Sequence, residues 1–372
     1  MKKFFNPDKN DWPGILRRPT QTLEDIEQTV MKIFKEVQAD GDRVLRKYTK
    51  QFDGVEISDL PVGPEEFTQA EALVPVRLKK AIEIAKSNIE KFHKAQKTSK
   101  IELETTPGVL CWQEKRPIQK VGLYIPGGTA PLFSTILMLA IPAGIAGCSE
   151  LILCSPPDKN GKIHPAILYT ANLCGITKVF KVGGIQAIAG MTFGTESIPK
   201  VYKIFGPGNQ FVTVAKQLAT KYDVAIDMPA GPSELLVVAD DSANAGFVAS
   251  DLLSQAEHGT DSQVILVSTS KKLMEQVEAE LQKQIIQLPR VDIAKMAIEN
   301  SKLIFVESDE IAIELINEYG PEHFIVCCND EEYYINNVVN AGSCLLYTSP
   351  SPRDPLRYRV CRLLREKGGG GG

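Results

Sequence analysis

The chain has 372 residues, of which 43% are hydrophobic and 24% are charged, proportions that are ordinary for a soluble globular protein. Lysine and arginine number 42 against 46 aspartate and glutamate, a formal net charge of −4 that gives no reason to expect a nucleic-acid partner. The longest apolar run, 132–146, is broken by Pro142 and is too short to span a membrane. We expect no secretory signal, and the scattered cysteines suit a reducing cytoplasm.

The length favours about two domains with ample core, and the first part of the chain is predicted to be helical after an irregular start. Residues 1–20 contain a Trp-Pro-Gly turn but no period, which indicates an extended N-terminal arm. Thr22 with Asp25 resembles a capping box that opens a helix with one apolar stripe, and Gly41 is expected to end it. Pro75 can begin the next long helix.

From residue 121 onwards, short apolar runs typical of strands alternate with helical patterns. The predicted strands are 121–125, 151–154, 179–182, 201–205, 224–226, 235–238, 264–267, 303–306 and 324–326. This alternation predicts βαβ units and mostly parallel sheets, and so many strands indicate two sheets rather than one. Because right-handed crossovers place ligand loops at the carboxyl ends of parallel strands, functional residues are expected at those ends.

Four predicted strands are followed by loops rich in glycine, at 127–129, 183–186, 206–209 and 230–233. Glycine lets the backbone approach a ligand closely, and the helix N-termini just beyond these loops would attract an anion such as pyrophosphate. None of the loops matches G-x-G-x-x-G, so they indicate a dinucleotide site without specifying one. Tight strand-to-helix turns are the alternative interpretation.

Two short motifs carry side chains suited to chemistry. Gln255 and His258 are three residues apart in an apolar periodic run that Gly259 follows, which predicts one face of a helix at its end. An imidazole and an amide oxygen can both bind a divalent metal, although a capped helix with one surface histidine explains the same pattern. Glu322 and His323 lie in a loop that enters a strand, and both are general-base candidates unless they form a solvated polar turn.

Taken together, six blocks of the sequence resemble histidinol dehydrogenase, and the resemblance runs from about Thr22 to Ser343. The blocks are YIPGGTAPLFST, VGGIQAIAGMTFGTESIPKV, KIFGPGNQFVT, AIDMPAGPSE, SDLLSQAEHGTDSQVIL and YGPEH. The resemblance implies the oxidation of L-histidinol to L-histidine in two NAD-dependent steps through a bound aldehyde, which is the last step of histidine biosynthesis. It also implies a zinc ion and a homodimer in which the arm and the C-terminal tail reach the partner.

Residue by residue, the resemblance assigns roles to positions in this chain. The positions that match NAD contacts are Tyr124, Gln186 and Asn209. The positions that match substrate contacts are Ser233, Gln255, His258 and His323. The positions that match zinc ligands are Gln255 and His258. Glu322 and His323 match the catalytic pair, in which His323 takes the hydroxyl proton and Glu322 activates the water that hydrates the aldehyde.

The resemblance further implies two Rossmann-like domains with mostly parallel sheets, related to the aldehyde dehydrogenase-like layout, the second inserted in the first. We place the first domain at 21–124 plus 235–343 and the inserted domain at 125–234, after an arm at 1–20. At about Ser343 the globular pattern stops, and 344–372, which ends in five glycines, is expected to be a non-native or disordered tail without packed elements. It resembles read-through from adapter sequence, so we expect the natural C-terminus to be missing.

The family takes two further zinc ligands, an Asp and a His, and a substrate-binding Glu from its C-terminal part. The tail of this chain contains Asp354 and Glu366 outside the family motif and no histidine, so those roles are not transferred. We therefore expect this chain to bind zinc poorly and to turn over little histidinol. Two alternatives stay open: an aldehyde dehydrogenase-like oxidoreductase, which needs a nucleophilic cysteine, and a catalytically impaired protein that only binds a nucleotide.

Overall fold

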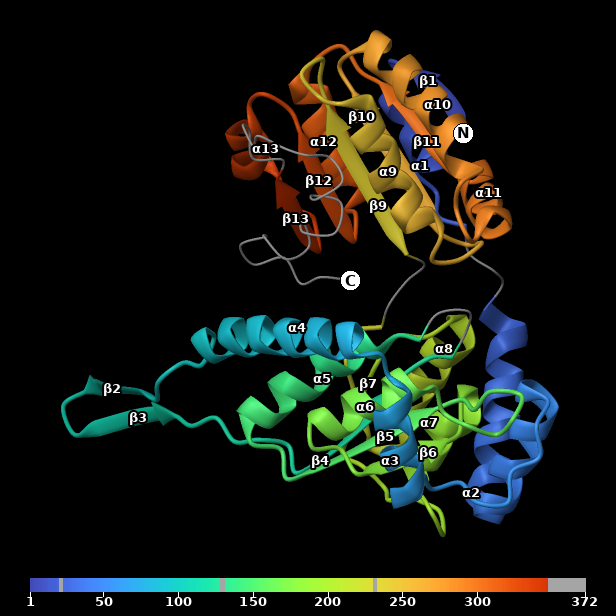
Figure 1. Ribbon diagram of the computed structural model, residues 1–372. Helices are drawn as coiled ribbons and strands as arrows, with labels where there is room; N and C mark the ends of the chain where they lie inside the picture. The colour runs from blue at the N-terminus through green and yellow to red at the C-terminus, as the bar shows by residue number, and fades with distance from the viewer. Residues whose placement is uncertain (20–22, 128–130, 230–232, 347–372) are drawn as a thin grey trace. The chain divides into compact units, whose positions relative to one another are not determined.

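The computed structural model describes residues 1–19, 23–127, 131–229 and 233–346 (Figure 1). The chain forms two compact units, which we call the terminal unit (Met1–Gln21 with Gly231–Gly372) and the central unit (Thr22–Ala230). Each unit has a parallel sheet with helices packed against it, so the predicted α/β class is confirmed. None of the helices in the described part is both long enough and apolar enough to cross a membrane.

The central unit is built on a five-stranded parallel sheet in the order β6-β5-β4-β7-β8. Its strands are β4 (Lys120–Tyr124), β5 (Glu150–Ser155), β6 (Lys178–Lys181), β7 (Lys203–Phe205) and β8 (Ala225–Ile226). The chain adds β5 and β6 on one side of β4, then returns to add β7 and β8 on the other side. The strand order therefore reverses between β4 and β7, and such a switch point leaves a crevice at the carboxyl ends of the strands.

Helices cover both faces of this sheet. They are α2 (Leu23–Asp53), α3 (Pro64–Leu73), α4 (Val76–Ala95), α5 (Phe133–Ala146), α6 (Pro165–Leu173), α7 (Gly184–Phe193) and α8 (Gln210–Ala219), with a 3-10 turn η2 (Thr220–Tyr222). Apolar residues of α2, α7 and α8 share one buried cluster, and those of α3, α5 and α6 share another. Gly41 interrupts α2 with a φ of 49°, where a helix end was expected, and Pro75 caps α4. Thr22 and the Asp25 side chain of the predicted capping box lie outside the described residues.

A hairpin that the sequence did not predict joins the central unit between α4 and β4. Its strands, β2 (Ile101–Thr106) and β3 (Val109–Gln113), are antiparallel, and it projects away from the rest of that unit (Figure 1). At least half of the surface of each of its large apolar side chains is exposed; these are Ile101, Leu103, Val109, Leu110 and Trp112. A two-stranded hairpin is marginally stable alone in water, so these side chains form an apolar surface without a described partner.

The terminal unit has a six-stranded parallel sheet in the order β1-β11-β10-β9-β12-β13. Its strands are β1 (Lys2–Phe5), β9 (Glu234–Ala239), β10 (Gln263–Ser268), β11 (Lys302–Phe305), β12 (His323–Cys327) and β13 (Ser343–Leu346). The helices are α1 (Trp12–Ile15), α9 (Ala245–Ala256), α10 (Lys271–Ile285), α11 (Val291–Glu299), α12 (Asp309–Tyr319) and α13 (Glu331–Asn337), with a 3-10 turn η1 (Lys9–Asp11). One buried cluster joins α9, α10 and α11 to one face of the sheet, and α1, α12 and α13 cover the other.

The strand pairing differs from the sequence expectations at both ends of the chain. Every strand predicted from residue 121 onwards is present with bounds shifted by one or two residues. The N-terminal arm, however, begins with β1, which pairs in parallel with β11. At the other end, β13 includes 344–346, because these apolar residues pair with β12. The rest of the segment that was predicted to lack packed elements, 347–372, lies outside the described residues.

The boundary between the two units also differs from the predicted domains. Residues 21–124 were assigned to the same domain as 235–343, and the insertion was placed at 125–234. In the structure β4 hydrogen-bonds to β5 and β7, and α2 shares a buried cluster with α7 and α8. Strand pairing and packing therefore place the whole of Thr22–Ala230 in one unit.

Candidate functional site

The predicted substrate, metal and catalytic residues all lie in the terminal unit, at one edge of its sheet. Ser233 immediately precedes β9, Glu322 immediately precedes β12, and His323 is the first residue of β12. Gln255 lies in the last turn of α9, and His258 lies between α9 and β10. These positions are at the amino ends of the strands, so the candidates in this unit occupy the edge opposite to the one that the sequence predicted.

Gln255 and His258 are joined by a turn rather than by a continuous helical face. The helix α9 ends at Ala256, two residues earlier than expected, and Gly259 does not take the positive φ of a helix-ending glycine. The backbone N–H of His258 donates to the carbonyl of Gln255 at 3.1 Å, while the Gln255 side chain is buried. The turn therefore brings the backbones of Gln255 and His258 close together.

The imidazole of His258 is electrostatically coupled to the other candidate pair. Burial lowers the pKa of His258, the charge of His323 lowers it further, and Glu322 acts in the opposite direction. These three side chains are thus near enough for their charges to influence one another. Although the residue is exposed to solvent, the lowered pKa of His258 keeps its imidazole neutral, so a nitrogen lone pair stays available for a proton or a metal.

Hydrogen bonds around His323 define which ring nitrogen is free. Its Nδ1 lies 2.9 Å from the Oγ of Ser343, the residue paired with it in register on β13. The same hydroxyl donates to the carbonyl of Glu322 at 3.3 Å. A hydroxyl has one proton, so in the neutral imidazole these two contacts assign the ring proton to Nδ1 and the lone pair to Nε2. That nitrogen lies 3.8 Å from Oε1 of Glu322.

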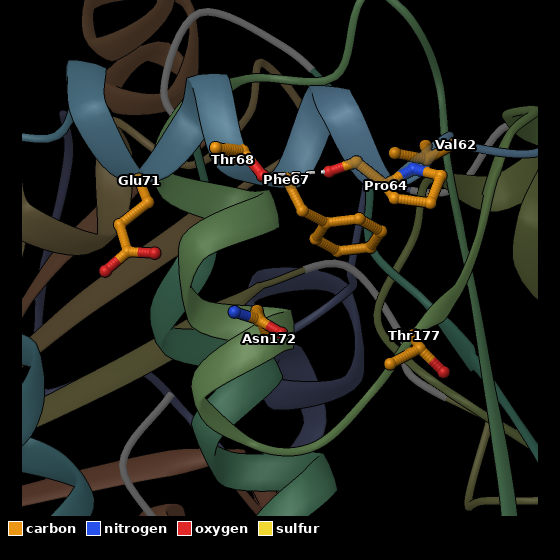
Figure 2. A pocket seen from close by; sticks show the side chains of 7 residues that line it. All are labelled: Val62, Pro64, Phe67, Thr68, Glu71, Asn172 and Thr177. Carbon is orange, nitrogen blue, oxygen red and sulfur yellow. Dashed lines mark hydrogen bonds between the residues drawn. The ribbon is translucent and has the colours of Figure 1, made fainter.

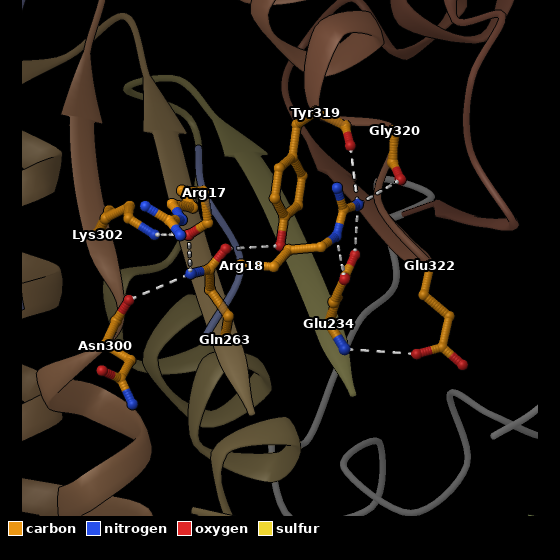
Figure 3. A network of polar contacts seen from close by, with 9 residues as sticks. All are labelled: Arg17, Arg18, Glu234, Gln263, Asn300, Lys302, Tyr319, Gly320 and Glu322. Atoms are coloured by element: carbon orange, nitrogen blue, oxygen red, sulfur yellow. Dashed lines mark hydrogen bonds and ion pairs between the residues drawn. The ribbon is translucent and has the colours of Figure 1, made fainter. Parts of the chain in front are cut away.

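The carboxylate of Glu322 has one oxygen anchored and its surface half open. Its Oε2 accepts a hydrogen bond of 3.4 Å from the backbone N–H of Glu234, the first residue of β9 (Figure 3). Its side chain is 48% exposed, so water can reach the carboxylate. Nε2 of His323 and the solvent-accessible carboxylate of Glu322 therefore lie close together, which is an arrangement suited to proton abstraction.

The three predicted NAD contacts lie in the central unit, at the carboxyl ends of its strands. Tyr124 is the last residue of β4, Gln186 lies in the first turn of α7, and Asn209 caps α8 through its Oδ1, which accepts from Val212 N–H at 3.1 Å. Tyr124 and Asn209 flank the switch point between β4 and β7. Here the sequence expectation about the carboxyl edge holds for the position of all three residues.

Several glycines at this edge lie where the backbone packs too closely against other residues for a side chain to fit. Gly206, with a φ of 137°, brings the loop after β7 so close to the Tyr124 carbonyl that a β-carbon would collide with it. A β-carbon on Gly127 or Gly183 would collide with the Pro156 side chain. Glycine is therefore required where these loops converge, as expected for loops that approach a ligand closely.

The side chains at the same edge include polar atoms without partners. Gln186 is 1% exposed, and among the described residues neither its amide nitrogen nor its amide oxygen has a hydrogen-bond partner. The hydroxyl of Tyr124 accepts from Gly184 N–H at 3.0 Å, and burial raises the pKa of this tyrosine to about 12. A buried amide with both groups unpaired is costly, so the residues present fit a bound group that donates and accepts hydrogen bonds.

For a metal the donors are fewer. In the described ranges no cluster of three His, Cys, Asp or Glu side chains is arranged to hold an ion. The candidate donors are the amide of Gln255 and the imidazole of His258, whereas a tetrahedral zinc site uses four ligands. Among the described residues these two donors would supply only half of the ligands of a tetrahedral zinc site.

A separate surface pocket involves none of these residues. It has a volume of about 320 Å³ and lies beside α3 and α6 (Figure 2), and its lining residues are Val62, Pro64, Phe67, Thr68, Glu71, Asn172 and Thr177.

Three residues that were not predicted from the sequence touch the candidate catalytic pair or its supports. They are Ser343, Arg18 and Glu234. Only Glu234 carried a local signal, as a charged residue that opens an apolar strand.

Comparison with known proteins gives one family. The family model described as histidinol dehydrogenase matches residues 16–353. A histidinol dehydrogenase of Bacteroides fragilis is 57% identical over 346 residues, covering 93% of this chain and 81% of that protein. The Escherichia coli K12 enzyme is 50% identical over 89% of this chain and 76% of its own length. The crystal structure of histidinol dehydrogenase from Elizabethkingia anophelis superposes with a TM-score of 0.90 at 52% identity, covering 93% of this chain and 80% of that one.

Proposed function

Because the chain belongs to the histidinol dehydrogenase family, an oxidoreductase family of histidine biosynthesis, we propose that it converts L-histidinol to L-histidine in two NAD-dependent oxidations through a bound aldehyde. The observation that carries this proposal is the position of His323 Nε2, 3.8 Å from the Glu322 carboxylate, in a ring whose Nδ1 lies beside the Ser343 hydroxyl. An alcohol oxidation needs a base for the hydroxyl proton, and the second oxidation needs a base for water.

In the first step His323 Nε2 takes the proton of the substrate hydroxyl while a hydride leaves the carbon that bears this hydroxyl. The bound NAD supplies the hydride acceptor in each oxidation. The proton taken up makes His323 an imidazolium, which the neighbouring Glu322 carboxylate stabilises by its negative charge. Ser343 keeps the ring in one tautomer, so the basic nitrogen is the one that faces this carboxylate.

In the second step the aldehyde is hydrated before it is oxidised, because a second hydride can leave only from a carbon that still carries hydrogen and bears a hydroxyl. Glu322 takes a proton from the attacking water, and its half-exposed carboxylate is open to that water. The backbone N–H of Glu234 holds the other oxygen. Ser233, one residue before Glu234, supplies a polar contact for the substrate.

The dinucleotide would be held at the carboxyl edge of the central unit by Tyr124, Gln186 and Asn209. The unpaired amide of Gln186 supports this assignment, because a ligand would satisfy both of its buried groups. The glycines at the same edge allow the backbone to come close.

Zinc would be held by Gln255 and His258, and its contribution would be to orient the substrate rather than to polarise the reacting oxygen. The lowered pKa of His258 supports a neutral imidazole donor. Because these donors make up only part of a zinc site, we assign no catalytic step to the metal, and weak zinc binding by this chain stays a prediction. The exposed apolar hairpin β2–β3 supports a homodimer.

The aldehyde dehydrogenase-like alternative needs a cysteine thiolate, which requires a lowered pKa. Burial instead raises the pKa of Cys174 to about 11 and raises those of Cys148, Cys154 and Cys328. The direct test is NADH formation by the purified chain with L-histidinol. We expect two NADH for each histidine, at a low rate because the zinc ligands are incomplete. His323→Gln should lower the rate by about 10² to 10⁴-fold. Binding of NAD without histidinol-dependent reduction would instead favour the nucleotide-binding alternative.

A further inference from the structure

One guanidinium joins the N-terminal arm to two elements of the terminal unit (Figure 3). Arg18 donates from Nε to one carboxylate oxygen of Glu234 and from Nη2 to the other at 2.8 Å. The same Nη2 donates to the carbonyls of Tyr319 at 2.9 Å and Gly320 at 3.2 Å. The guanidinium also lies 4.6 Å from the centre of the Tyr319 ring. Arg18 therefore contacts the start of β9 and the end of α12 at once.

Because the Glu234 carboxylate is buried, it needs the charge of Arg18. Glu234 is 4% exposed, and a charged group so deeply buried is costly unless it is paired. The hydrogen bond that Arg18 donates to the Glu234 carboxylate raises the pKa of Arg18, so the guanidinium is always charged. A planar fork with several donors can satisfy a carboxylate and two carbonyls together, which a lysine ammonium does not do with the same geometry.

Both elements held by Arg18 lead directly to the candidate catalytic pair. The backbone N–H of Glu234 anchors Oε2 of Glu322. Gly320 ends α12 in a left-handed conformation with a φ of 57°, and only Pro321 separates it from Glu322. Arg18 therefore reaches the Glu322 side chain through Glu234, and it reaches the Glu322–His323 backbone through Gly320.

A second layer of hydrogen bonds fixes the arm beside Arg18. The carbonyl of Arg17 accepts from Gln263 Nε2 at 3.1 Å, and the oxygen of that amide accepts from the Tyr319 hydroxyl at 3.0 Å. Lys302 Nζ also donates to the Arg17 carbonyl at 3.5 Å. These hydrogen bonds therefore fix the backbone of the arm next to Arg18, whose side chain reaches Glu234.

We propose that Arg18 is a positioning residue for the Glu322–His323 pair, acting through Glu234 and the carbonyls at the end of α12. The proposal rests on the proposed function for its catalytic consequence, but the positioning itself is a property of the terminal unit. Neither Arg18 nor Glu234 needs to touch the substrate. Their effect is to hold two bases where protons must be taken.

The kinetic test compares Arg18→Ala, Arg18→Lys and the matched control Arg17→Ala, since among the described contacts Arg17 joins the network through its carbonyl rather than its side chain. Arg18→Ala should lower kcat per folded molecule by about 100-fold, as expected for a misplaced catalytic group. KM for NAD should stay unchanged, because the candidate NAD contacts lie in the central unit. Added guanidinium should restore part of kcat, Arg18→Lys should recover less than full activity, and Arg17→Ala should match the wild type.

A second readout does not depend on activity. The chain has four histidines, so the ring signals of each can be assigned by nuclear magnetic resonance with single His→Gln variants. Arg18→Ala should shift the signals of His323 and leave those of His93 and His164, which belong to the central unit, as in the wild type. If the wild-type chain does not oxidise histidinol, the proposed function fails, and these signals still decide the positioning.

Three results would overturn the proposal. The first is an Arg18→Ala variant with wild-type kcat per folded molecule. The second is a fall in kcat with unshifted His323 signals, which would mean that Arg18 acts by another route. The third is a joint change of all four histidine signals without rescue by guanidinium, which would show that the arginine only maintains the fold.

Discussion

The hydroxyl of Ser343 lies 2.9 Å from Nδ1 of His323 and donates to the carbonyl of Glu322 at 3.3 Å. These two hydrogen bonds connect β13 to the candidate base on β12, at residues that are also paired in register. Because the hydroxyl proton is committed to a carbonyl, the histidine must donate from Nδ1, and its Nε2 is free. A strand-edge serine thus selects the tautomer that the proposed chemistry needs.

Removal of this hydroxyl should weaken the base without removing it. We expect Ser343→Ala to lower kcat about 5-fold, because one lost hydrogen bond contributes about 1 kcal/mol and a barrier increase of ~1.4 kcal/mol slows a reaction tenfold. The acid limb of the pH–rate profile should move as well. Ser343→Thr keeps the hydroxyl and is the matched control. A Ser343→Ala enzyme with the pH–rate profile of the wild type would contradict the tautomer argument.

Substitution of Gln186 should have opposite effects on folding and on NAD binding. In the free protein both groups of its buried amide are unpaired, which costs about 1–3 kcal/mol. Gln186→Met has a similar volume and no polar atoms, so we expect a larger free energy of unfolding without NAD and a weaker affinity for NAD. Denaturant unfolding with and without NAD measures both quantities. Lower stability in the NAD-free variant would argue against an unsatisfied amide.

The carboxyl of Asp53, at the end of α2, should make stability depend on pH. Burial raises its pKa from 3.8 to about 6, so folding favours the protonated form. For a raised pKa the favourable contribution is complete below the unfolded value and is lost as pH rises through the folded value. We therefore expect Asp53→Asn to be more stable than the wild type above pH ~7, with the difference vanishing towards pH ~4. Unfolding curves of both proteins across this range provide the measurement, and a constant difference would refute the shift.

A buried ion pair should hold the loop that carries Asn209. Lys216 is almost fully buried, forms an ion pair with Asp227 and donates to the carbonyl of Gly206 at 2.8 Å, while Asp227 accepts from the N–H of Gly206 at 2.9 Å. Lys216→Met leaves a partly buried carboxylate unpaired, which should cost about 3 kcal/mol.

The same variant should raise KM for NAD more than it lowers kcat, because the loosened loop bears a proposed NAD contact. Lys216→Met combined with Asp227→Asn should recover part of the stability, since it removes the unpaired charge. An unchanged KM for NAD in Lys216→Met would separate this ion pair from the dinucleotide site.

The strands of both sheets between β4 and β12 were predictable from the sequence, because an apolar run between turn residues is a local property. The placement of Tyr124, Gln186 and Asn209 at the carboxyl edge of their sheet followed from the same local order of strand, loop and helix. The six sequence blocks also identified the family, which the comparisons confirm.

Other features depended on partners far away in the chain. Residues 2–5 look irregular in sequence, and they are a strand only because β11, about three hundred residues later, offers an edge. The sequence places Glu322 and His323 where a strand begins, but no local pattern encodes the position of β12 between β9 and β13, which brings Glu234 and Ser343 next to them.

The sequence by itself determined the elements, the family and the candidate residues, since these depend on residue type and spacing over short stretches. Tertiary structure alone decided that Thr22–Ala230 is one unit, that Ser343 orients His323, and that Arg18 reaches Glu234 and the end of α12. The physical reason is that a hydrogen bond or a strand pair joins two positions whose separation in sequence is unconstrained. Only the folded backbone specifies which donor meets which acceptor.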